Sequence, residues 1–352
     1  MGKQRKVTRR RFIGDAAIGA AGVAVALNSG SVLVAAQELA KSKSNIRNYN
    51  PDMEYRRLGR TGLMVSAVAL GGHWKRMDVM RQGLDENRRQ VINRCIEVGI
   101  NYVDACTGVE FTTYSKVLSV VGREKVYLGL SHAEQEPRKE AYRTKNKLLE
   151  SLDSALRDAR QEYADLWRMT CMETGSRHSY ESSCEIVAAL EKAKKQGKAR
   201  FVGISSHDRR WLKFMIEYFP QIEVVLFPYT ANSKVLPTDS IFEALKKQDM
   251  GALGIKPFSS NSIFKGSSAP QEPTAEEDSR TARMVIRCIL GNPHIIPIPG
   301  LISPAQVDNV ARAVKEHRQL DATEAQELSM RMEQAWASLP ANYQWLKNWE
   351  YV

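Results

Sequence analysis

The sequence predicts an α/β protein built on one (β/α)₈ TIM barrel, and three observations support this fold class. From Tyr55 onward, eight short apolar runs rich in β-branched residues alternate with longer amphipathic stretches. The alternation spans roughly 260 residues, the length of one such barrel. No Gly-x-Gly-x-x-Gly turn follows an early run, which disfavours the alternative architecture, a doubly wound sheet.

Residues 1–36 have the order of an export signal: basic, then apolar, then small. Thr8-Arg9-Arg10-Arg11-Phe12-Ile13 resembles the twin-arginine signal, an address read by the twin-arginine translocase. The following apolar run is too short and too rich in Ala and Gly for a stable membrane span. We therefore expect a protein exported folded to the periplasm or cell envelope, with its mature chain beginning near Gln37. The alternative is a generic basic leader or an uncleaved anchor.

The charge of the chain is concentrated in this signal. The net charge is +11, and six basic residues against Asp15 place +5 of it within residues 1–36. The remaining +6 is diffuse and has no aromatic-basic stripe, which argues against nucleic-acid binding. Five cysteines, an odd and small number for 352 residues, exclude a scaffold built on disulfides.

The elements of the barrel are expected in order within residues 54–320, after a polar linker at 37–53. The expected strands are 65–70, 102–104, 126–130, 164–169, 200–204, 223–227, 252–255 and 295–298. Apolar residues at helical spacing predict helices at 86–98, 141–158, 182–196, 209–218, 241–247, 280–290 and 304–314. Gly99 and Gly197 provide stops for two of them.

An extra C-terminal segment, residues 321–352, follows the barrel and begins as a helix. Its end is unusually aromatic, with Tyr343, Trp345, Trp349 and Tyr351 within nine residues. We expect this stretch either to fold back over the barrel mouth or to join two subunits of an oligomer.

Short motifs in this frame carry a family resemblance. Residues 55–66 (Tyr-Arg-Arg-Leu-Gly-Arg-Thr-Gly-Leu-Met-Val-Ser), 99–104 (Gly-Ile-Asn-Tyr-Val-Asp), 197–205 and 298–307 resemble, in family order, segments of the aldo/keto reductases. The resemblance implies transfer of a hydride between NADP or NAD and a small-molecule carbonyl or alcohol. It also implies a small N-terminal β-hairpin at 55–66 that closes the bottom of the barrel, and chemistry at the carboxyl ends of the barrel strands.

The catalytic residues implied by the resemblance are mostly replaced. The family uses an aspartate, a proton-donating tyrosine, a lysine that lowers the pKa of that phenol, and a histidine that orients the carbonyl. Asp104 occupies the aspartate position, but Val109, Ser131 and Thr170 stand at the other three. Valine cannot donate a proton and serine carries no charge, so the usual mechanism is not available in its usual form.

Other reactive residues stand beside the vacated positions, and two interpretations of them stay open. These residues are His73, Trp74, Cys106, Tyr114, His132, Cys171, His207 and Asp208. In a rebuilt site, His132 or Tyr114 acts as general acid, Asp104 orients it, and Cys106 or Cys171 serves as a thiolate or as a ligand of Zn²⁺. In a decayed site, the same residues only pack. No pair has the spacing of metal ligands on a helix, so no metal ligand is assigned.

The cofactor-binding residues implied by the resemblance match the family better at the phosphates than at the nicotinamide. Ser205 and Ser206 stand at the nicotinamide, although Leu226 and Ile255 replace a glutamine and a stacking tyrosine there. The expected pyrophosphate contacts are Lys256, Pro257, Phe258, Ser259 and Ser260, and the expected adenosine contacts are Gly300, Ser303, Gln306 and Asn309. Arg280, Arg283 and Arg287 recur at helical spacing and either face a phosphate or form a solvated surface.

Three functions follow from these observations. The first is an exported, NAD(P)-linked oxidoreductase with an altered active site. The second is a catalytically inactive or repurposed barrel that binds a small ligand or a partner. The third is a metal-assisted enzyme on the same face of the barrel.

Overall fold

The computed structural model describes residues 46–72, 84–172, 178–266 and 273–352. Residues Ile46–Val352 form one compact unit. The expected signal at 1–36, with His73 and Trp74, lies outside the described residues. No helix in the described ranges is long and apolar enough to cross a membrane.

A parallel sheet of seven strands runs in sequence order, each strand paired with the next along the chain. Its strands are β3 (Tyr102–Ala105), β4 (Tyr127–Leu130), β5 (Ala164–Met172), β6 (Ala199–Ser206), β7 (Val224–Pro228), β8 (Gly251–Ile255) and β9 (Ile296–Pro297). This strand order is the one expected for a barrel, because every crossover returns beside the strand that it left.

The segment expected to form the first barrel strand differs from the prediction. Its beginning, β2 (Met64–Ser66), pairs antiparallel with β1 (Tyr55–Arg57) and so forms the expected hairpin. Its end makes only an isolated bridge between Leu70 and Val103. Backbone bonds nevertheless join this end to both edges of the sheet: Leu70 N donates to Tyr102 O over 3.0 Å, and Gly71 N donates to Pro299 O over 2.7 Å.

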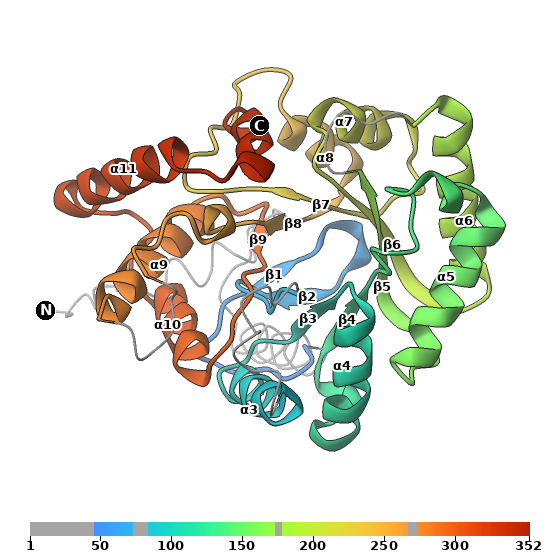
Figure 1. The fold of residues 1–352 in the computed structure, drawn as a ribbon, viewed down its shortest axis with the longest axis horizontal. Helices are drawn as coiled ribbons and strands as arrows, with labels where there is room; N and C mark the ends of the chain where they lie inside the picture. Colours follow the sequence, from blue (N-terminus) through green and yellow to red (C-terminus); the bar gives the residue numbers. More distant parts are fainter. Residues whose placement is uncertain (1–45, 73–83, 173–177, 267–272) are drawn as a thin grey trace, which may run out of the picture. The chain divides into compact units, whose positions relative to one another are not determined.

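Helices follow the strands and surround them in Figure 1. They are α3 (Leu84–Glu97), α4 (Gly108–Val121), α5 (Lys145–Asp158), α6 (Tyr180–Lys195), α7 (Arg209–Tyr218), α8 (Ile241–Gln248), α9 (Ala275–Leu290) and α10 (Pro304–Lys315). Helix α9 begins five residues before the predicted start, and α5 begins four residues after it because the 3₁₀ turn Glu140–Tyr142 precedes it.

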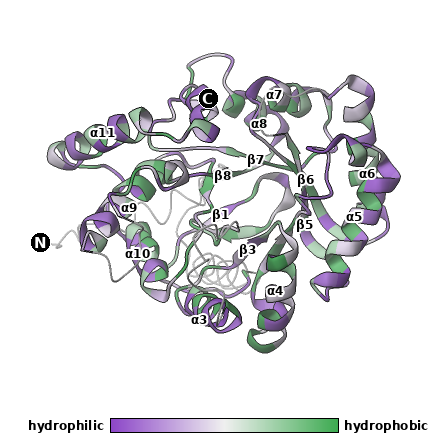
Figure 2. Cartoon of the chain, viewed as in Figure 1, coloured by the Kyte–Doolittle hydropathy of each residue, from purple (hydrophilic) through white to green (hydrophobic). Residues whose placement is uncertain are grey.

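The apolar side chains form two layers, one on each face of the sheet. Inside the ring of strands, Tyr102, Leu166, Val224 and Leu253 belong to one buried cluster. A larger cluster packs the outer face of the sheet against the helices. Figure 2 shows the corresponding apolar colouring along the strands and a mixed colouring along the helices. Because strand side chains alternate between faces, the residues in phase with the inner cluster point into the barrel lumen.

A buried carboxylate anchors the amino-terminal end of β5. Asp165 is fully buried and pairs with Arg47 at 3.2 Å, Arg123 at 2.6 Å and Arg200 at 2.5 Å. Residues 46–53, which the sequence places in a linker, therefore pack on the barrel through Arg47.

The C-terminal segment folds back onto loops that follow the carboxyl ends of the strands. After α11 (Ala322–Ala337), the 3₁₀ segment η6 (Ala341–Trp349) brings Trp349 onto Phe227 with ring centroids 5.6 Å apart. Trp345 stacks on His207 at 4.0 Å, and Val352 N donates to Lys234 O over 2.9 Å. We call residues 341–352 the C-terminal strap.

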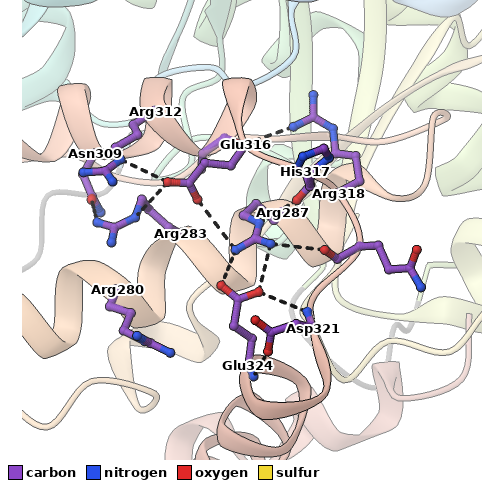
Figure 3. A network of polar contacts seen from close by, with 12 residues as sticks. Arg280, Arg283, Arg287, Asn309, Arg312, Glu316, His317, Arg318, Asp321 and Glu324 are labelled. Carbon is purple, nitrogen blue, oxygen red and sulfur yellow. Dashed lines mark hydrogen bonds and ion pairs between the residues drawn. The ribbon is translucent and has the colours of Figure 1, made fainter. Parts of the chain in front are cut away.

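Helix α11 is joined to α9 by the polar network of Figure 3. Arg287 of α9 donates to Glu324 of α11 over 2.6 and 2.9 Å, and its Nε donates to His317 O over 2.6 Å. Glu316 lies within 4 Å of Arg283, Arg287 and Arg312. Arg283 and Arg287, which were expected to face either a phosphate or solvent, thus form ion pairs with acidic residues of the protein.

Candidate active site

The lumen at the carboxyl end of the strands contains a buried ion pair. Asp104 of β3 and Arg168 of β5 are 2% and 5% exposed. Arg168 Nε donates to Asp104 Oδ1 over 3.0 Å, and Nη2 donates to Oδ2. Tyr102 Oη also donates to Oδ1, over 3.2 Å. Burial by itself lowers the pKa of Arg168, but attraction to the Asp104 carboxylate holds it well above its ordinary value.

Gly129 makes room for this pair. A side-chain carbon built at Gly129 of β4 would overlap Tyr102 Oη and would lie 2.7 Å from Asp104 Oδ1. The absent side chain therefore lets the Asp104 carboxylate and its Tyr102 donor sit against the backbone of the neighbouring strand.

Arg168 begins a chain of polar contacts that ends at a second buried carboxylate. Its Nη1 donates to Thr170 Oγ1 over 3.1 Å, and Thr170 Oγ1 lies 2.8 Å from Ser131 Oγ. Ser131 Oγ donates to Glu136 Oε2 over 2.5 Å. The backbone amides of Thr170 and His132 also donate to this carboxylate, over 2.7 and 2.8 Å.

Burial governs the protonation of Glu136. The side chain has no exposed surface, and burial raises the pKa of its carboxyl, although the three hydrogen bonds it accepts oppose that rise. Ser131 is fully buried, whereas Thr170 is only half-buried. Thr170 is thus the most exposed member of the Thr170–Ser131–Glu136 chain.

Sequence reasoning missed Arg168 and Glu136. Arg168 has a recognisable signal, because a charged residue two positions before Thr170 in an apolar strand must share the face of Thr170. Glu136 has none, because it lies in the loop after β4 and its burial depends on how that loop folds against β5.

Both predicted general acids contact the layer between α4 and the sheet, to which Phe111 and Tyr114 belong. His132, at the end of β4, is 7% exposed, with Nδ1 3.2 Å from Glu134 and its ring edge-on to Phe111 at 5.2 Å. Tyr114 was expected among residues projecting from the strand ends, but it lies fully buried in the layer between α4 and the sheet. Burial there raises the pKa of its phenol well above 10. Asp104 directs its carboxylate to Arg168 and Tyr102.

The two cysteines beside the vacated positions are buried thiols. Burial raises the pKa of Cys106 and of Cys171 well above 9, which disfavours the thiolate form of either. Within the described ranges, no three or more His, Cys, Asp and Glu side chains are grouped in a way that could hold a metal ion.

The loop after β8 brings together side-chain donors for an anion, and we call it the anion cradle. Lys256, Ser259, Ser260 and Asn261 all have positive φ angles, between 49° and 71°, and the turn is closed by Ser259 N donating to Lys256 O over 2.9 Å and Asn261 N donating to Phe258 O over 2.7 Å. The buried Ser259 hydroxyl has no hydrogen-bond partner among the described residues. Phe258 is buried, and the Lys256 ammonium lies 5.4 Å from the ring centre of Tyr343 in the C-terminal strap. This donor set, with Pro257 between, fits the pyrophosphate of a dinucleotide.

The other expected cofactor residues lie at the end of β6 and in or just before helix α10. Ser205 and Ser206 end β6 and are 5% and 1% exposed, and Ser206 Oγ accepts from Asp208 N over 3.0 Å. Gly300 is exposed. Ser303 caps α10 by accepting from Gln306 N over 3.2 Å, while Gln306 Oε1 accepts from Ile302 N over 2.8 Å.

Asn309 is engaged within the protein. Its Oδ1 accepts from Arg283 over 2.7 Å, as Figure 3 shows, and its Nδ2 donates to Ser279 O over 2.9 Å. The side chain therefore links α10 to α9, and an adenosine contact would require it to leave these partners.

Two surface cavities in the described part of the chain lie outside the barrel lumen. One, of about 490 Å³, is lined by residues of α7, α8 and the loop before α8, among them Lys213 and Asp239. The other, of about 320 Å³, contains Arg280, Arg283, Arg287 and Arg312. Neither contains an expected nicotinamide, pyrophosphate or adenosine contact, although the second is lined by the three arginines for which a phosphate or a solvated surface was the expectation.

Comparison with known proteins places these residues in a family. The profile of the aldo/keto reductase family matches residues 67–285. L-galactose dehydrogenase from Arabidopsis thaliana is 23% identical over 291 residues, which is 75% of this chain and 89% of that protein.

Solved structures support the fold. The holo form of aldo-keto reductase AKR11C1 from Bacillus halodurans superimposes with a TM-score of 0.61 at 18% identity, covering 83% of this chain and 99% of that one. An aldo/keto reductase from Klebsiella pneumoniae, solved with NADP and acetate, gives a TM-score of 0.58 at 18% identity over 79% of this chain and 94% of its own. The family profile spans more than half of the sequence, and the chain belongs to the aldo/keto reductase family.

Proposed function

We propose that this chain is an NAD(P)-linked oxidoreductase that interconverts a small carbonyl and its alcohol with an altered set of catalytic residues. The observation that carries the proposal is the buried Asp104–Arg168 pair at the carboxyl ends of β3 and β5. The family resemblance implies an aspartate paired with a lysine from the following strand, where Ser131 stands. Here a cation from the next strand along, β5, takes that position beside the aspartate, so a charged site persists although the lysine is lost.

The anion cradle after β8 supports the cofactor assignment. Lys256 supplies a positive charge, and Ser259 and Ser260 supply hydroxyls on the same short loop. Ser205 and Ser206 lie at the end of β6, where the nicotinamide is expected. The cofactor supplies hydride acceptance or donation, while the residues of this chain bind the substrate and handle the proton.

Cofactor binding is the first test. Protein purified from the cell envelope should release NAD or NADP on denaturation, or its tryptophan fluorescence should be quenched on titration with one of them. Lys256→Met should weaken binding at least about tenfold, because it removes a charge from a phosphate contact. Lys347→Met, a surface change outside the cradle, serves as the control. If the wild type neither releases nor binds a dinucleotide, the oxidoreductase proposal is abandoned.

A second candidate function is a barrel that binds a ligand without turning it over. It is favoured by Val109, which stands at the position of the proton-donating tyrosine and is 61% exposed on α4. Turnover separates the two candidates: the bound cofactor should change its absorbance at the nicotinamide band with some member of a panel of aldehydes, ketones and sugar alcohols. Binding without any such change favours the ligand-binding barrel.

We also propose export by the twin-arginine route with the cofactor already bound, since that route carries folded proteins. N-terminal sequencing of the envelope fraction should begin near Gln37, and replacing Arg9 and Arg10 by Lys should retain the precursor in the cytoplasm. Material that begins at Met1 in the envelope would contradict cleavage.

A further inference from the structure

The chain Thr170–Ser131–Glu136 has a defined proton direction. Arg168 Nη1 can only donate, so Thr170 Oγ1 accepts from it. An ionised Glu136 can only accept, so the single proton of Ser131 is directed to Oε2. The remaining contact, 2.8 Å between the two hydroxyl oxygens, must then use the proton of Thr170. Both hydroxyls consequently point inward, from the barrel mouth toward Glu136.

The chain also has one open acceptor at its outer end. A hydroxyl oxygen has two lone pairs, and the Arg168 contact uses one of those on Thr170 Oγ1. Thr170 is half-buried at the position where the family resemblance implies the carbonyl-orienting histidine. A substrate hydroxyl that reached this position would donate to the second lone pair.

We propose that Thr170, Ser131 and Glu136 form a proton relay that replaces the missing tyrosine, with Thr170 as the catalytic residue that contacts the substrate oxygen. The relay rests on the proposed oxidoreductase function. During alcohol oxidation, the hydride on the substrate carbon would be taken up by the oxidised nicotinamide dinucleotide of the proposed function. The substrate O–H bond breaks and its proton binds Thr170 Oγ1, the Thr170 proton moves to Ser131 Oγ, and the Ser131 proton moves to Glu136 Oε2. One proton thus leaves the substrate and Glu136 becomes neutral. Carbonyl reduction runs the same steps in reverse.

Arg168 supplies the electrostatic part of this site. Its guanidinium donates to Thr170 Oγ1 while Asp104 holds its other edge. A cation fixed in a buried site stabilises the negative charge that develops on the hydroxyl oxygens as protons pass along the chain. Arg168 is therefore a positioning residue of the relay, and Asp104 is the group that keeps it in place.

The surroundings of Glu136 suit a group that takes up and returns a proton. The charged and titratable groups that face it are Arg168 and Cys171 of β5, together with the hydrogen-bonding backbone of His132 on its own loop. Arg168 lowers the pKa of Glu136 less than burial raises it. A carboxyl tuned upward in this way accepts a proton more readily than an exposed glutamate does.

The competing explanation is that Glu136 only ties the loop after β4 to β5, and hydroxyl variants separate the two. Ser131→Ala and Thr170→Val should each lower kcat roughly 100-fold, the contribution expected of positioned proton transfer, and leave cofactor affinity within about twofold. Thr170→Ser keeps the hydroxyl and should recover most of the activity. The matched control is Ser151→Ala, a fully buried serine of α5 outside the site, which should change kcat less than about twofold. Turnover within twofold of wild type in Ser131→Ala and Thr170→Val overturns the relay.

A second readout needs neither cofactor nor substrate. Infrared titration should show one buried carboxyl that becomes protonated as the pH falls, with a C=O stretch that is lost in Glu136→Gln and shifted in Ser131→Ala. The Ser131→Ala shift alone assigns the band if Glu136→Gln does not fold. A wild type without turnover would refute the proposed function, whereas absence of this carboxyl band overturns the relay whether or not the enzyme turns over.

Discussion

At the residue scale, the lumen is organised by Arg168. One guanidinium reaches Asp104 on β3 and Thr170 on its own strand, so it links the ion pair to the hydroxyl chain. Because the pair is almost completely buried, each charge is stabilised by the other and not by water.

This dependence predicts a strongly non-additive pair of substitutions. Arg168→Met should lower the free energy of unfolding by about 3–5 kcal/mol, because it leaves the Asp104 carboxylate buried without its cation. The double variant Asp104→Leu with Arg168→Met should recover most of that loss. Urea denaturation measures both.

Arg89→Met is the control for this cycle, because Arg89 pairs with Glu86 on the exposed surface of α3 and should change stability by less than about 1 kcal/mol. A double variant as unstable as Arg168→Met alone would show that the loss comes from packing and not from an unpaired charge.

The sequence predicts the candidate site only in part, for a physical reason. Asp104, Ser131 and Thr170 follow from strand ends, because position within a strand fixes the direction of a side chain. The pairing of Asp104 with Arg168 depends on which side chains lie opposite each other across the lumen, and the sequence does not show this. Gly129 makes the pairing possible because it has no side chain to occupy the space. The sequence does not show that Tyr114 points away from the site, because a residue on a helix can face either the sheet or the solvent.

At the element scale, the C-terminal strap ties together loops that follow three neighbouring strands. It contacts His207 after β6, Lys234 after β7 and Lys256 after β8. The helix α11 that precedes it is fixed by Arg287 and has a capping box between Asp321 and Glu324. The sequence predicts the helix and the aromatic stretch, but only the contacts in the structure show where that stretch packs.

Trp349 is the anchor of this strap and provides the next prediction. Its side chain is 1% exposed, stacks on Phe227 and donates from Nε1 to His207 O over 2.9 Å. Trp349→Ala should lower the free energy of unfolding by about 3–5 kcal/mol, the usual cost of removing a large buried aromatic side chain. Thermal unfolding measures this, and hydrogen exchange should show faster opening of residues 229–240.

Tyr351→Ala removes an aromatic side chain from the same strap at a site that is 52% exposed, and it should cost less than about 1 kcal/mol. Equal losses in the two variants would mean that the strap is held by its backbone pairing and not by Trp349.

At the scale of the whole molecule, the fold was largely predictable because its signals are local. Alternating apolar runs and helical stretches specify the order of strands and helices, and parallel strands with crossovers leave few arrangements. The first strand departs from the pattern, because residues 64–66 serve the hairpin and leave only residues 67–71 to join β3 and β9.

The pH dependence of global stability is a further prediction. Burial lowers the pKa of His178 from 6.5 to about 4, so the unfolded chain binds this proton more readily than the folded protein does. The free energy of unfolding should therefore fall as the pH drops from about 6.5 to about 4. Because the group is only partly buried, the loss should be about 1–2 kcal/mol. Denaturant titrations of wild type and His178→Gln at pH 7 and pH 4 measure it.

His178→Gln should lose less stability than the wild type between pH 7 and pH 4. His317 is left unchanged in both proteins. Glu136 acts in the opposite sense, since its raised pKa makes the folded protein the better proton binder above pH 4.5. Identical pH profiles for wild type and variant would contradict the assignment of this loss to His178.

The fold-back of residues 341–352 has a consequence for how the protein reaches its native state. Lys234 and Glu350 are 116 positions apart, so the contact between them closes a long loop and is entropically costly to form early. The strap contacts loops that follow three different strands, so the surface on which it docks exists only once those strands have assembled. If the chain is exported folded, as we propose, docking of residues 341–352 belongs to the last events that precede export.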